Sequence, residues 1–374
     1  MKIEPLGLYV HIPFCLRKCN YCDFCSFSDL EKNQRESYLS RLTEEILSYK
    51  RSDKIKIDTI FFGGGTPSLL EPCEFFKIHD SIRDAFEISH NTEFTIEVNP
   101  KTLDKDKLQA FTSRGVNRIS IGLQTIHENE LKILGRIHAL SDFEKVYQLC
   151  RASGITNISV DIMYGIPEQT TGSFQQTLEY VASLQPTHIS AYGLILEEDT
   201  KFWDMRNSLS LPSEDAECDM YNLACQLLSS HGYSHYEISN YAKPGFESKH
   251  NLKYWRDKEY IGVGISAYSY FYGRRYGNSR SLTEYLSKNP KQYISEELID
   301  DSESAYEFAM LAFRLSAGLS LSEYEKRYGI DFLLNREEKI RAYVKSGYMG
   351  RAGDRIFLTE KGFYVSNTIL TDLL

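Results

Sequence analysis

The sequence lacks a long hydrophobic run and any stretch rich in Lys and Arg. The segment from Met1 to Gly7 carries a single Lys and leads into an apolar run too short for a signal peptide or a membrane span. We therefore expect a cytoplasmic protein without a transmembrane segment. The 43 basic and 52 acidic residues give a net charge of -9 without blocks of one sign, so nucleic acid is not an expected partner.

Internal repeats and low-complexity segments are also absent. A chain of 374 residues exceeds the size at which a single core stops growing, which predicts one large domain and a smaller second one. We expect the boundary between residues 235 and 236, so that the domains comprise residues 1–235 and 236–374.

Cysteine is too sparse for a disulfide scaffold, yet half of it is clustered. Four of the eight cysteines lie within the segment HIPFCLRKCNYCDFCSF, residues 11–27. In a reducing compartment such a cluster indicates metal binding or catalysis before cross-links. The scattered thiols are expected to be buried and without a chemical role; they are Cys73, Cys150, Cys218 and Cys225.

Short apolar, β-rich runs alternate with amphipathic stretches through the first two thirds of the chain. This alternation predicts an α/β fold, a partial parallel (β/α)6 barrel of the TIM type. The expected strands are residues 8–11, 59–62, 94–98, 118–123, 158–163 and 188–193, and the helices between them include residues 35–49 and 143–152.

Polar or glycine-rich segments follow successive predicted strands. The cysteine run follows the first strand, GGGTP the second, EVNP the third, GLQT the fourth and DIMYGIP the fifth. Because ligand sites of such barrels collect at the carboxyl ends of the strands, these segments predict one shared mouth.

The last third of the chain is expected to form a mainly helical domain. A helix is predicted over residues 303–315. The tail pattern of a helix, two short strands about residues 352–354 and a further helix is typical of a winged-helix-like segment. Without a basic helix, a docking or packing role is favoured over nucleic-acid contact.

Cys15, Cys19 and Cys22 form the spacing C-x3-C-x2-C. Structural zinc usually takes two separated ligand pairs, and no second pair follows Cys25 within the next forty residues, so zinc is the weaker alternative. Three thiolates can instead hold three corners of a 4Fe-4S cluster and leave one iron open to another ligand.

This spacing, with Tyr21 just before the third cysteine, resembles the radical S-adenosylmethionine (SAM) superfamily. The resemblance implies that SAM chelates the open iron through its amino and carboxylate groups. It also implies that an electron from the cluster cleaves the sulfonium to give a 5′-deoxyadenosyl radical. A related group of enzymes carries a fourth cysteine where Phe24 stands here, so Cys25 is expected to be only a neighbour of the cluster.

The same resemblance implies a SAM site inside the barrel. Gly64, Gly65 and Thr66 would bring the backbone close to the methionine ammonium, although an ordinary turn also explains them. Glu97 ends an apolar strand, where ribose hydroxyls would satisfy a carboxylate that is costly to bury alone. The other implied SAM contacts are Tyr9, Tyr21, Gln124, Arg136 and Asp161.

Among these, Arg136 could bind the SAM carboxylate in a bidentate manner. Taken alone, Gln124, Arg136 and Asp161 are better explained as solvated groups or structural hydrogen bonds. Only the set, together with the cysteines, favours a cofactor site.

Longer segments of the sequence point to one family within this superfamily. LYVHIPFC, FFGGGTPS, IEVNP, SIGLQT, DIMYGIPEQT and YEISNYAKPG are similar to the oxygen-independent coproporphyrinogen oxidase family, and particularly to its HemW-type branch of heme chaperones. Three features favour this branch over the oxidases. The first strand lies near the start of the chain, whereas oxidases carry a long arm before it. Phe24 stands where the oxidases carry a fourth cysteine, and the segment HNLKYW matches the heme-binding branch. The resemblance implies heme as cargo and acceptor hemoproteins as partners, with membrane-surface transfer and a homodimer as further expectations.

His250 begins the motif HNLKYW and is the candidate axial ligand of heme iron implied by the resemblance. By residue chemistry alone, His250 is better explained as a surface or supporting histidine. Tyr268 stands where relatives commonly carry another His, which leaves open a phenolate ligand or a weakened site. The alternative function is oxidative decarboxylation of coproporphyrinogen III to protoporphyrinogen IX.

Overall fold

A computed structural model describes residues 4–374 of the chain. Its centre is six parallel strands in sequential order within a 12-stranded sheet. The strands are β1 (Leu6–Ile12), β2 (Ile55–Gly64), β3 (Phe86–Val98), β4 (Arg118–Gln124), β5 (Asn157–Tyr164) and β6 (His188–Gly193). The predicted partial (β/α)6 barrel is confirmed.

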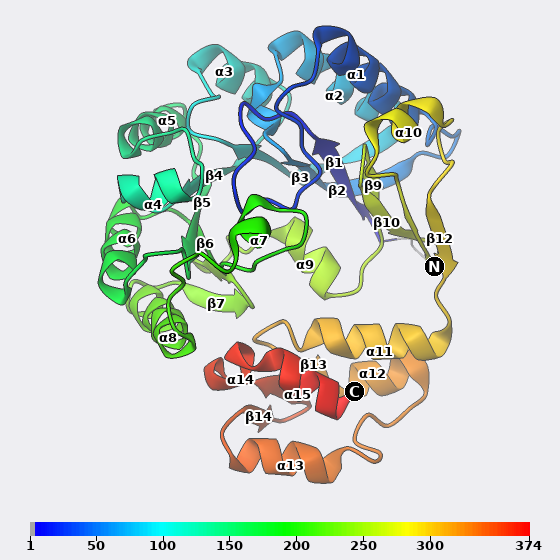
Figure 1. Ribbon diagram of the computed structural model, residues 1–374. Helices are drawn as coiled ribbons and strands as arrows, with labels where there is room; N and C mark the ends of the chain where they lie inside the picture. The colour runs from blue at the N-terminus through cyan, green and yellow to red at the C-terminus, as the bar shows by residue number, and fades with distance from the viewer. Residues whose placement is uncertain (1–3) are drawn as a thin grey trace.

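Helices cover the outer face of these strands (Figure 1). They are α1 (Lys32–Leu47), α2 (Pro72–Ala85), α3 (Lys105–Ser113), α4 (Glu128–Ile133), α5 (Leu140–Ala152), α6 (Thr171–Leu184) and α8 (Glu214–Ser230), with the 3-10 turn Pro67–Leu69 before α2. The short helix α7 (Lys201–Met205) follows β6. The helices predicted over residues 35–49 and 143–152 correspond to α1 and α5.

Strand β4 alternates apolar residues that face the core with small or polar residues that face the barrel interior. Ile119, Ile121 and Leu123 are fully buried, and burying such a side chain contributes roughly 1.5–3 kcal/mol. The alternate residues Ser120 and Gly122 face the barrel interior, where they line a cavity. The apolar face therefore anchors the strand, and the polar face is available for ligands.

Later segments extend both edges of the sheet. At the β1 edge the order continues with β9 (Tyr260–Val263), β10 (Tyr268–Phe271), β11 (Arg274–Gly277) and β12 (Ser295–Leu298), and at the β6 edge with β8 (Asn240–Ala242) and β7 (Ser234–Glu237). Helices α9 (Lys249–Trp255) and α10 (Leu282–Ser287) belong to the same region. The domain boundary predicted at residues 235 and 236 falls inside β7, and the division into two domains stays a prediction.

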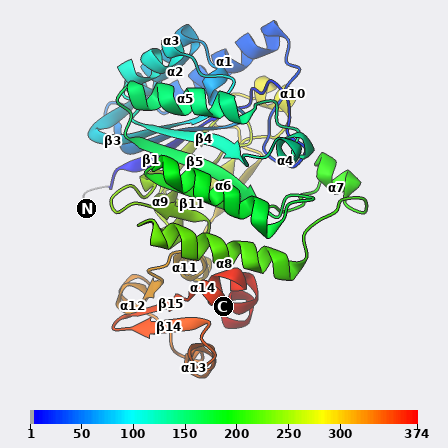
Figure 2. The ribbon, with the colours of Figure 1, turned by 90° about the vertical axis from the view of Figure 1, so that its left-hand side faces the viewer.

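A small C-terminal module lies below the barrel in both ribbon views (Figures 1 and 2). It contains α11 (Asp301–Ala312), β13 (Leu319–Ser320), α12 (Leu321–Tyr328), α13 (Glu337–Lys345), β14 (Met349–Ala352), β15 (Arg355–Leu358), α14 (Glu360–Tyr364) and α15 (Ser366–Leu373). The predicted order of a helix, two strands and a further helix is confirmed by α13, β14, β15 and α14. Two ion pairs join the module to the barrel region, Arg275 with Glu307 at 2.5 Å and Arg327 with Asp257 at 3.1 Å.

The scattered cysteines differ in burial. Cys150 and Cys225 lie in the core, as predicted. Cys73 is exposed and Cys218 is half-buried, so the prediction of buried thiols is wrong for these two, because they lie at solvent-facing positions of α2 and α8. Among residues 4–374, no helix is long and apolar enough to cross a membrane.

Candidate functional site

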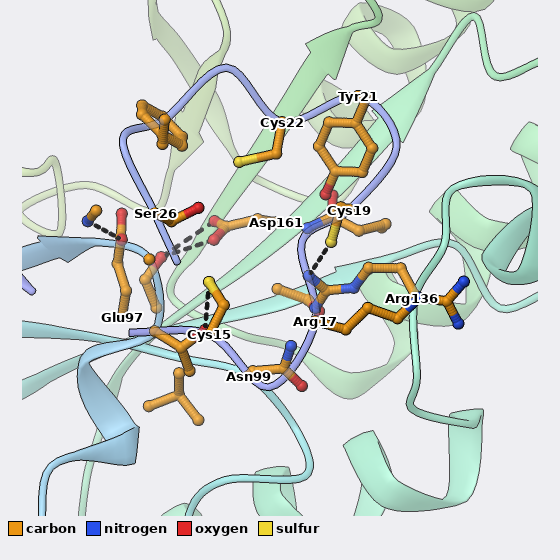
Figure 3. A pocket seen from close by; sticks show the side chains of 18 of the residues that line it. Cys15, Arg17, Cys19, Tyr21, Cys22, Ser26, Glu97, Asn99, Arg136 and Asp161 are labelled. Atoms are coloured by element: carbon orange, nitrogen blue, oxygen red, sulfur yellow. Dashed lines mark hydrogen bonds between the residues drawn. The ribbon is translucent and has the colours of Figure 1, made fainter. Parts of the chain in front are cut away.

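The carboxyl ends of the parallel strands surround a cavity of about 340 Å³ (Figure 3). The ends of β2 to β4 and the segments that follow β1 to β4 contribute to its wall, and β5 contributes Asp161 and Met163 from within the strand. Of the predicted site residues, those lining the cavity are Cys15, Cys19, Tyr21, Cys22, Gly64, Gly65, Thr66, Glu97, Gln124, Arg136 and Asp161. Tyr9 and His250 lie elsewhere.

The loop after β1 carries the three cysteines into this cavity. The base of the loop is closed by backbone hydrogen bonds from Cys15 N to the Phe27 carbonyl, 2.9 Å, and from Phe27 N to the Pro13 carbonyl, 2.7 Å. At the far side, the amide of Asn20 donates to the Leu134 carbonyl, 2.9 Å, next to α4. The loop is therefore held at its base and at its middle by hydrogen bonds within the protein.

The three sulfur atoms face a common space (Figure 3). Cys15 Sγ lies 3.7 Å from Thr66 Oγ1, and Arg136 Nη1 donates to Cys19 Sγ over 3.6 Å. Burial raises the pKa of Cys22 to about 11 and also raises that of Cys15, so both thiols are protonated at neutral pH in the free protein. A bound metal would convert them to thiolates and release protons.

The arrangement fits a cluster better than a single ion. Across the described chain, residues 4–374, no three His, Cys, Asp or Glu side chains converge on one point as ligands of one metal ion would. A 4Fe-4S cluster takes its cysteine ligands on separate irons, so it does not require convergence on a single point. Cys25 lines a neighbouring cavity instead, and its Sγ donates to the Arg280 carbonyl over 3.4 Å.

The glycines at the end of β2, Gly64 and Gly65, are required by close packing against β1 and the loop that follows it. Gly64 has a φ of 108°, and a Cβ there would come within 2.6 Å of the His11 ring. A Cβ at Gly65 would lie 2.7 Å from the Phe14 carbonyl oxygen. Larger residues at these positions would push the cysteine loop away from β2, so the glycines hold the cavity wall and its thiols together.

Two carboxylates face the cavity from β3 and β5. Glu97 accepts a hydrogen bond from Gly64 N at 3.2 Å, and Asp161 accepts from Ser120 Oγ at 3.0 Å. Burial, and then the charge of Asp161, raise the pKa of Glu97 to about 8; burial also raises the pKa of Asp161. The free site therefore holds Glu97 largely protonated at neutral pH, ready to ionise when hydrogen-bond donors arrive.

Arg136 and Gln124 occupy strained or incompletely satisfied positions. Arg136 Nη2 donates to the Gly122 carbonyl over 2.7 Å, but its buried Nε has no partner within residues 4–374. Gln124 has a φ of 72°, in the left-handed region that non-glycine residues rarely adopt. An unpaired buried guanidinium nitrogen beside a strained residue suits a carboxylate-bearing ligand.

Ser120 and Gly122 also line the cavity, although neither was predicted as a site residue. A Cβ on Gly122 would lie 3.2 Å from Arg136 Nη2, so this glycine makes room for the guanidinium. The signal was available: Ser120, Gly122 and Gln124 alternate along β4, and residues two apart on a strand share a face. Tyr192 of β6, also missed, is 40% exposed in the same wall.

Tyr9 lines the neighbouring cavity, and its hydroxyl donates to His11 Nδ1 over 3.0 Å. His250 is 1% exposed, with Nδ1 bonded to Thr59 Oγ1 at 2.9 Å and Nε2 to the Tyr254 hydroxyl at 2.8 Å. Burial lowers the pKa of His250 to about 3. Both of its ring nitrogens are therefore already hydrogen bonded within the protein.

Comparison with known proteins identifies the family. The model of the Radical SAM superfamily matches residues 9–181, and that of the HemN C-terminal domain matches residues 299–365. Heme chaperone HemW from Lactococcus lactis is 34% identical, covering 100% of this chain and 98% of that protein. The chain belongs to the HemW family of radical SAM proteins. HemW from Escherichia coli is 33% identical, over 99% of this chain and 98% of its own length.

The fold of this HemW family member also matches a solved structure. Coproporphyrinogen III oxidase (HemN) from Escherichia coli superposes with a TM-score of 0.85 and 23% identity, covering 99% of this chain and 90% of that one. At this identity the match establishes the shared fold. Membership of the radical SAM superfamily implies a 4Fe-4S cluster and SAM as cofactors.

Proposed function

We propose that this chain is a heme chaperone of the radical SAM type, which binds heme and transfers it to acceptor hemoproteins. The observation that carries the proposal is the full-length similarity to heme chaperones HemW from several bacteria. The cavity with three half-buried cysteines supports the cofactor part of the proposal.

Cys15, Cys19 and Cys22 are the proposed ligands of the 4Fe-4S cluster. When bound, the cluster supplies a site for SAM on its fourth iron and an electron for reductive cleavage of the sulfonium. The loop that carries the thiols is already closed by the hydrogen bonds between Cys15 and Phe27, which limits the reorganisation needed on assembly.

The surrounding side chains are the proposed SAM contacts. Glu97 would accept hydrogen bonds from the ribose hydroxyls, and Arg136 would bind the carboxylate through its unsatisfied Nε and the adjacent nitrogens. The backbone of Gly64 and Gly65, together with Thr66, would contact the methionine ammonium. Tyr21, Gln124 and Asp161 complete the proposed site, and Tyr9 is the one proposed SAM neighbour that does not line this cavity.

Heme ligation by His250 stays a prediction. It requires the imidazole to give up its bond to Tyr254 or to Thr59, and to leave a position that is 1% exposed. Acceptor hemoproteins are the proposed partners. Cytoplasmic location, transfer at a membrane surface and a homodimeric state stay predictions; size measurement in solution and vesicle co-sedimentation test the last two.

Hemin titration of the purified, anaerobically reconstituted protein tests the proposal. We expect a saturable change in the heme absorbance of the parent and weaker binding by His250→Ala, with the exposed His231→Ala as the matched control. A parent protein without saturable binding contradicts the chaperone function. Accumulation of protoporphyrinogen IX from coproporphyrinogen III, with reductant and SAM, would favour the oxidase instead.

A further inference from the structure

A second cavity of about 250 Å³ lies beside the first, against the returning limb of the cysteine loop. Phe24 lines both cavities. The remaining wall comes from segments far apart in the sequence: β1, helix α9, the strands β9 and β10 with the turn between them, and Arg280 before α10. Of the proposed SAM contacts, Tyr9 alone lines this second cavity.

The wall of the second cavity is rich in aromatic rings. Tyr9, Tyr254, Tyr260 and Tyr268 line it, and Phe24 at its boundary is 65% exposed. Tyr254 and Tyr260 meet edge to face, with ring centroids 4.6 Å apart. Aromatic walls favour a flat, largely apolar ligand, because offset and edge-to-face ring contacts add to the burial of apolar surface.

Tyr268 brings a phenol hydroxyl to the wall of this cavity. Its ring lies on Gly277, its cross-strand neighbour, where a Cβ would be 2.6 Å from Tyr268 Cε1. The side chain is 46% exposed, and its hydroxyl makes no hydrogen bond with any residue from 4 to 374. Tyrosine oxygen is one of the protein ligands that hold heme iron.

Arg280 supplies a cation at the same cavity. Its Nη2 donates to the Asp23 carbonyl at 2.9 Å and to the Asp23 carboxylate at 3.0 Å. The Arg280 side chain is 60% exposed, and such a surface ion pair contributes only about 0–1 kcal/mol. Arg280 can therefore exchange Asp23 for a carboxylate carried by a ligand.

We propose that the second cavity is the heme site, with Tyr268 Oη as the ligand of ferric iron and Arg280 bound to a propionate. This inference rests on the proposed chaperone function and adds the location of the cargo. A cavity of about 250 Å³ is smaller than the roughly 300–1,000 Å³ of pockets that enclose a whole ligand. One edge of the porphyrin would therefore remain outside, accessible to an acceptor protein.

The same geometry gives His250 a positioning role. Its Nε2 is bonded to the hydroxyl of Tyr254, which lines the second cavity. Replacing His250 would free Tyr254 to move and would disturb the cavity wall without removing the iron ligand. The motif HNLKYW thus contributes Tyr254 to the wall and His250 behind it.

Hemin titration of the full-length protein with Tyr268 variants tests the site. Tyr268→Phe is expected to lower hemin affinity on the order of tenfold and to remove the phenolate-to-iron charge-transfer band. Tyr268→His is expected to restore affinity with the spectrum of an imidazole ligand. Tyr272→Phe, an exposed tyrosine of the same hairpin outside the cavity wall, is the matched control.

The outcomes separate this inference from the proposed function. If the parent binds no hemin, the chaperone function fails. If the parent binds hemin and Tyr268→Phe keeps both its affinity and its spectrum while His250→Ala changes the iron ligation, the second cavity is not the heme site and the chaperone function stands. Circular dichroism and cluster iron content of each variant establish that it is folded.

Discussion

The two cavities beside the cysteine loop share Phe24 but differ in chemistry. The first is lined by thiols, two carboxylates and two guanidinium groups, Arg17 and Arg136, at the carboxyl ends of the barrel strands. The second contains four tyrosines, from β1, α9, β9 and β10, together with polar residues that include Asp23 and Arg280. One loop therefore separates the cavity proposed for SAM from the tyrosine-lined cavity proposed for heme.

The strongest way to sharpen this comparison is to remove one thiol. We expect Cys22→Ser to lose nearly all iron and sulfide after anaerobic reconstitution, because the proposed cluster then keeps only two cysteine ligands. Hemin binding should persist, since Cys22 does not line the second cavity. Cys218→Ser on α8 is the control, and parental iron content in Cys22→Ser would contradict the proposed ligation.

Substitution of Gly64 tests whether its close packing against His11 stabilises the protein. The Gly64 φ of 108° resembles that of Gly115, φ 97°, but a Cβ at Gly115 would meet no atom within 4 Å. Gly115→Ala should cost on the order of 1 kcal/mol of unfolding free energy, and Gly64→Ala about 1–3 kcal/mol more because of the clash with His11. Urea unfolding measures both, and equal losses would show that the contact is unimportant.

Arg136 tests whether the first cavity alone binds SAM. Removing a charged hydrogen-bond partner of a carboxylate costs about 1.5–3 kcal/mol, so Arg136→Gln should weaken SAM binding roughly 10- to 100-fold. Calorimetry on reconstituted protein measures this, with the exposed Arg151→Gln as control. A parental SAM affinity would remove Arg136 from the site, and an equal loss of hemin affinity would break the separation of the two cavities.

Glu97 gives the first cavity a pH dependence. Burial and the charge of Asp161 raise the pKa of Glu97 from 4.5 to about 8. The contribution of Glu97 to the stability of the ligand-free protein is therefore largest below pH 4.5, and it is lost as the pH rises through about 8. Ribose hydroxyls donate better to the ionised carboxylate. SAM affinity should therefore rise with pH up to about 8 and then level off, and Glu97→Gln should remove the slope. An identical slope in Glu97→Gln would assign it to another group.

The smallest effect on SAM is expected at Tyr9. Because Tyr9 lines the second cavity and donates to His11, Tyr9→Phe should leave SAM affinity nearly unchanged and weaken hemin binding modestly. Titrations with each ligand measure this. A larger effect on SAM than on hemin would return Tyr9 to the first site.

Local patterns were sufficient for much of the barrel. Apolar runs such as Ile119 to Leu123 predict a buried strand, because a strand inside a parallel sheet is buried on both faces. The boundaries were less predictable: β3 begins at Phe86, well before the apolar run that marked it, because β2 pairs with it from Ile55 onward. The addition of β9 to β12 at the sheet edge had no local signal.

The residues of the candidate site also differ in whether the local sequence predicts them. The spacing of Cys15, Cys19 and Cys22 lies within one loop, so it was visible in the sequence. Ser120 was not predicted as a site residue, because its role depends on a hydrogen bond to Asp161, which lies 41 residues away on the next strand. His250 carried a motif, and its contact with Tyr254 lies within α9, but its contact with Thr59 depends on how α9 packs against β2.

The sequence by itself determined the α/β barrel, the cysteine loop and the order of the polar segments, because periodicity and loop composition are local properties of the chain. Only the tertiary structure decided that a second, aromatic cavity lies beside the first. Its wall joins Tyr9, Phe24, Tyr254, Tyr268 and Arg280, which come together through the pairing of β9 with β1 and the fold-back of the β9–β10 segment. Such contacts follow from the packing of distant elements, and no pattern along the chain encodes them.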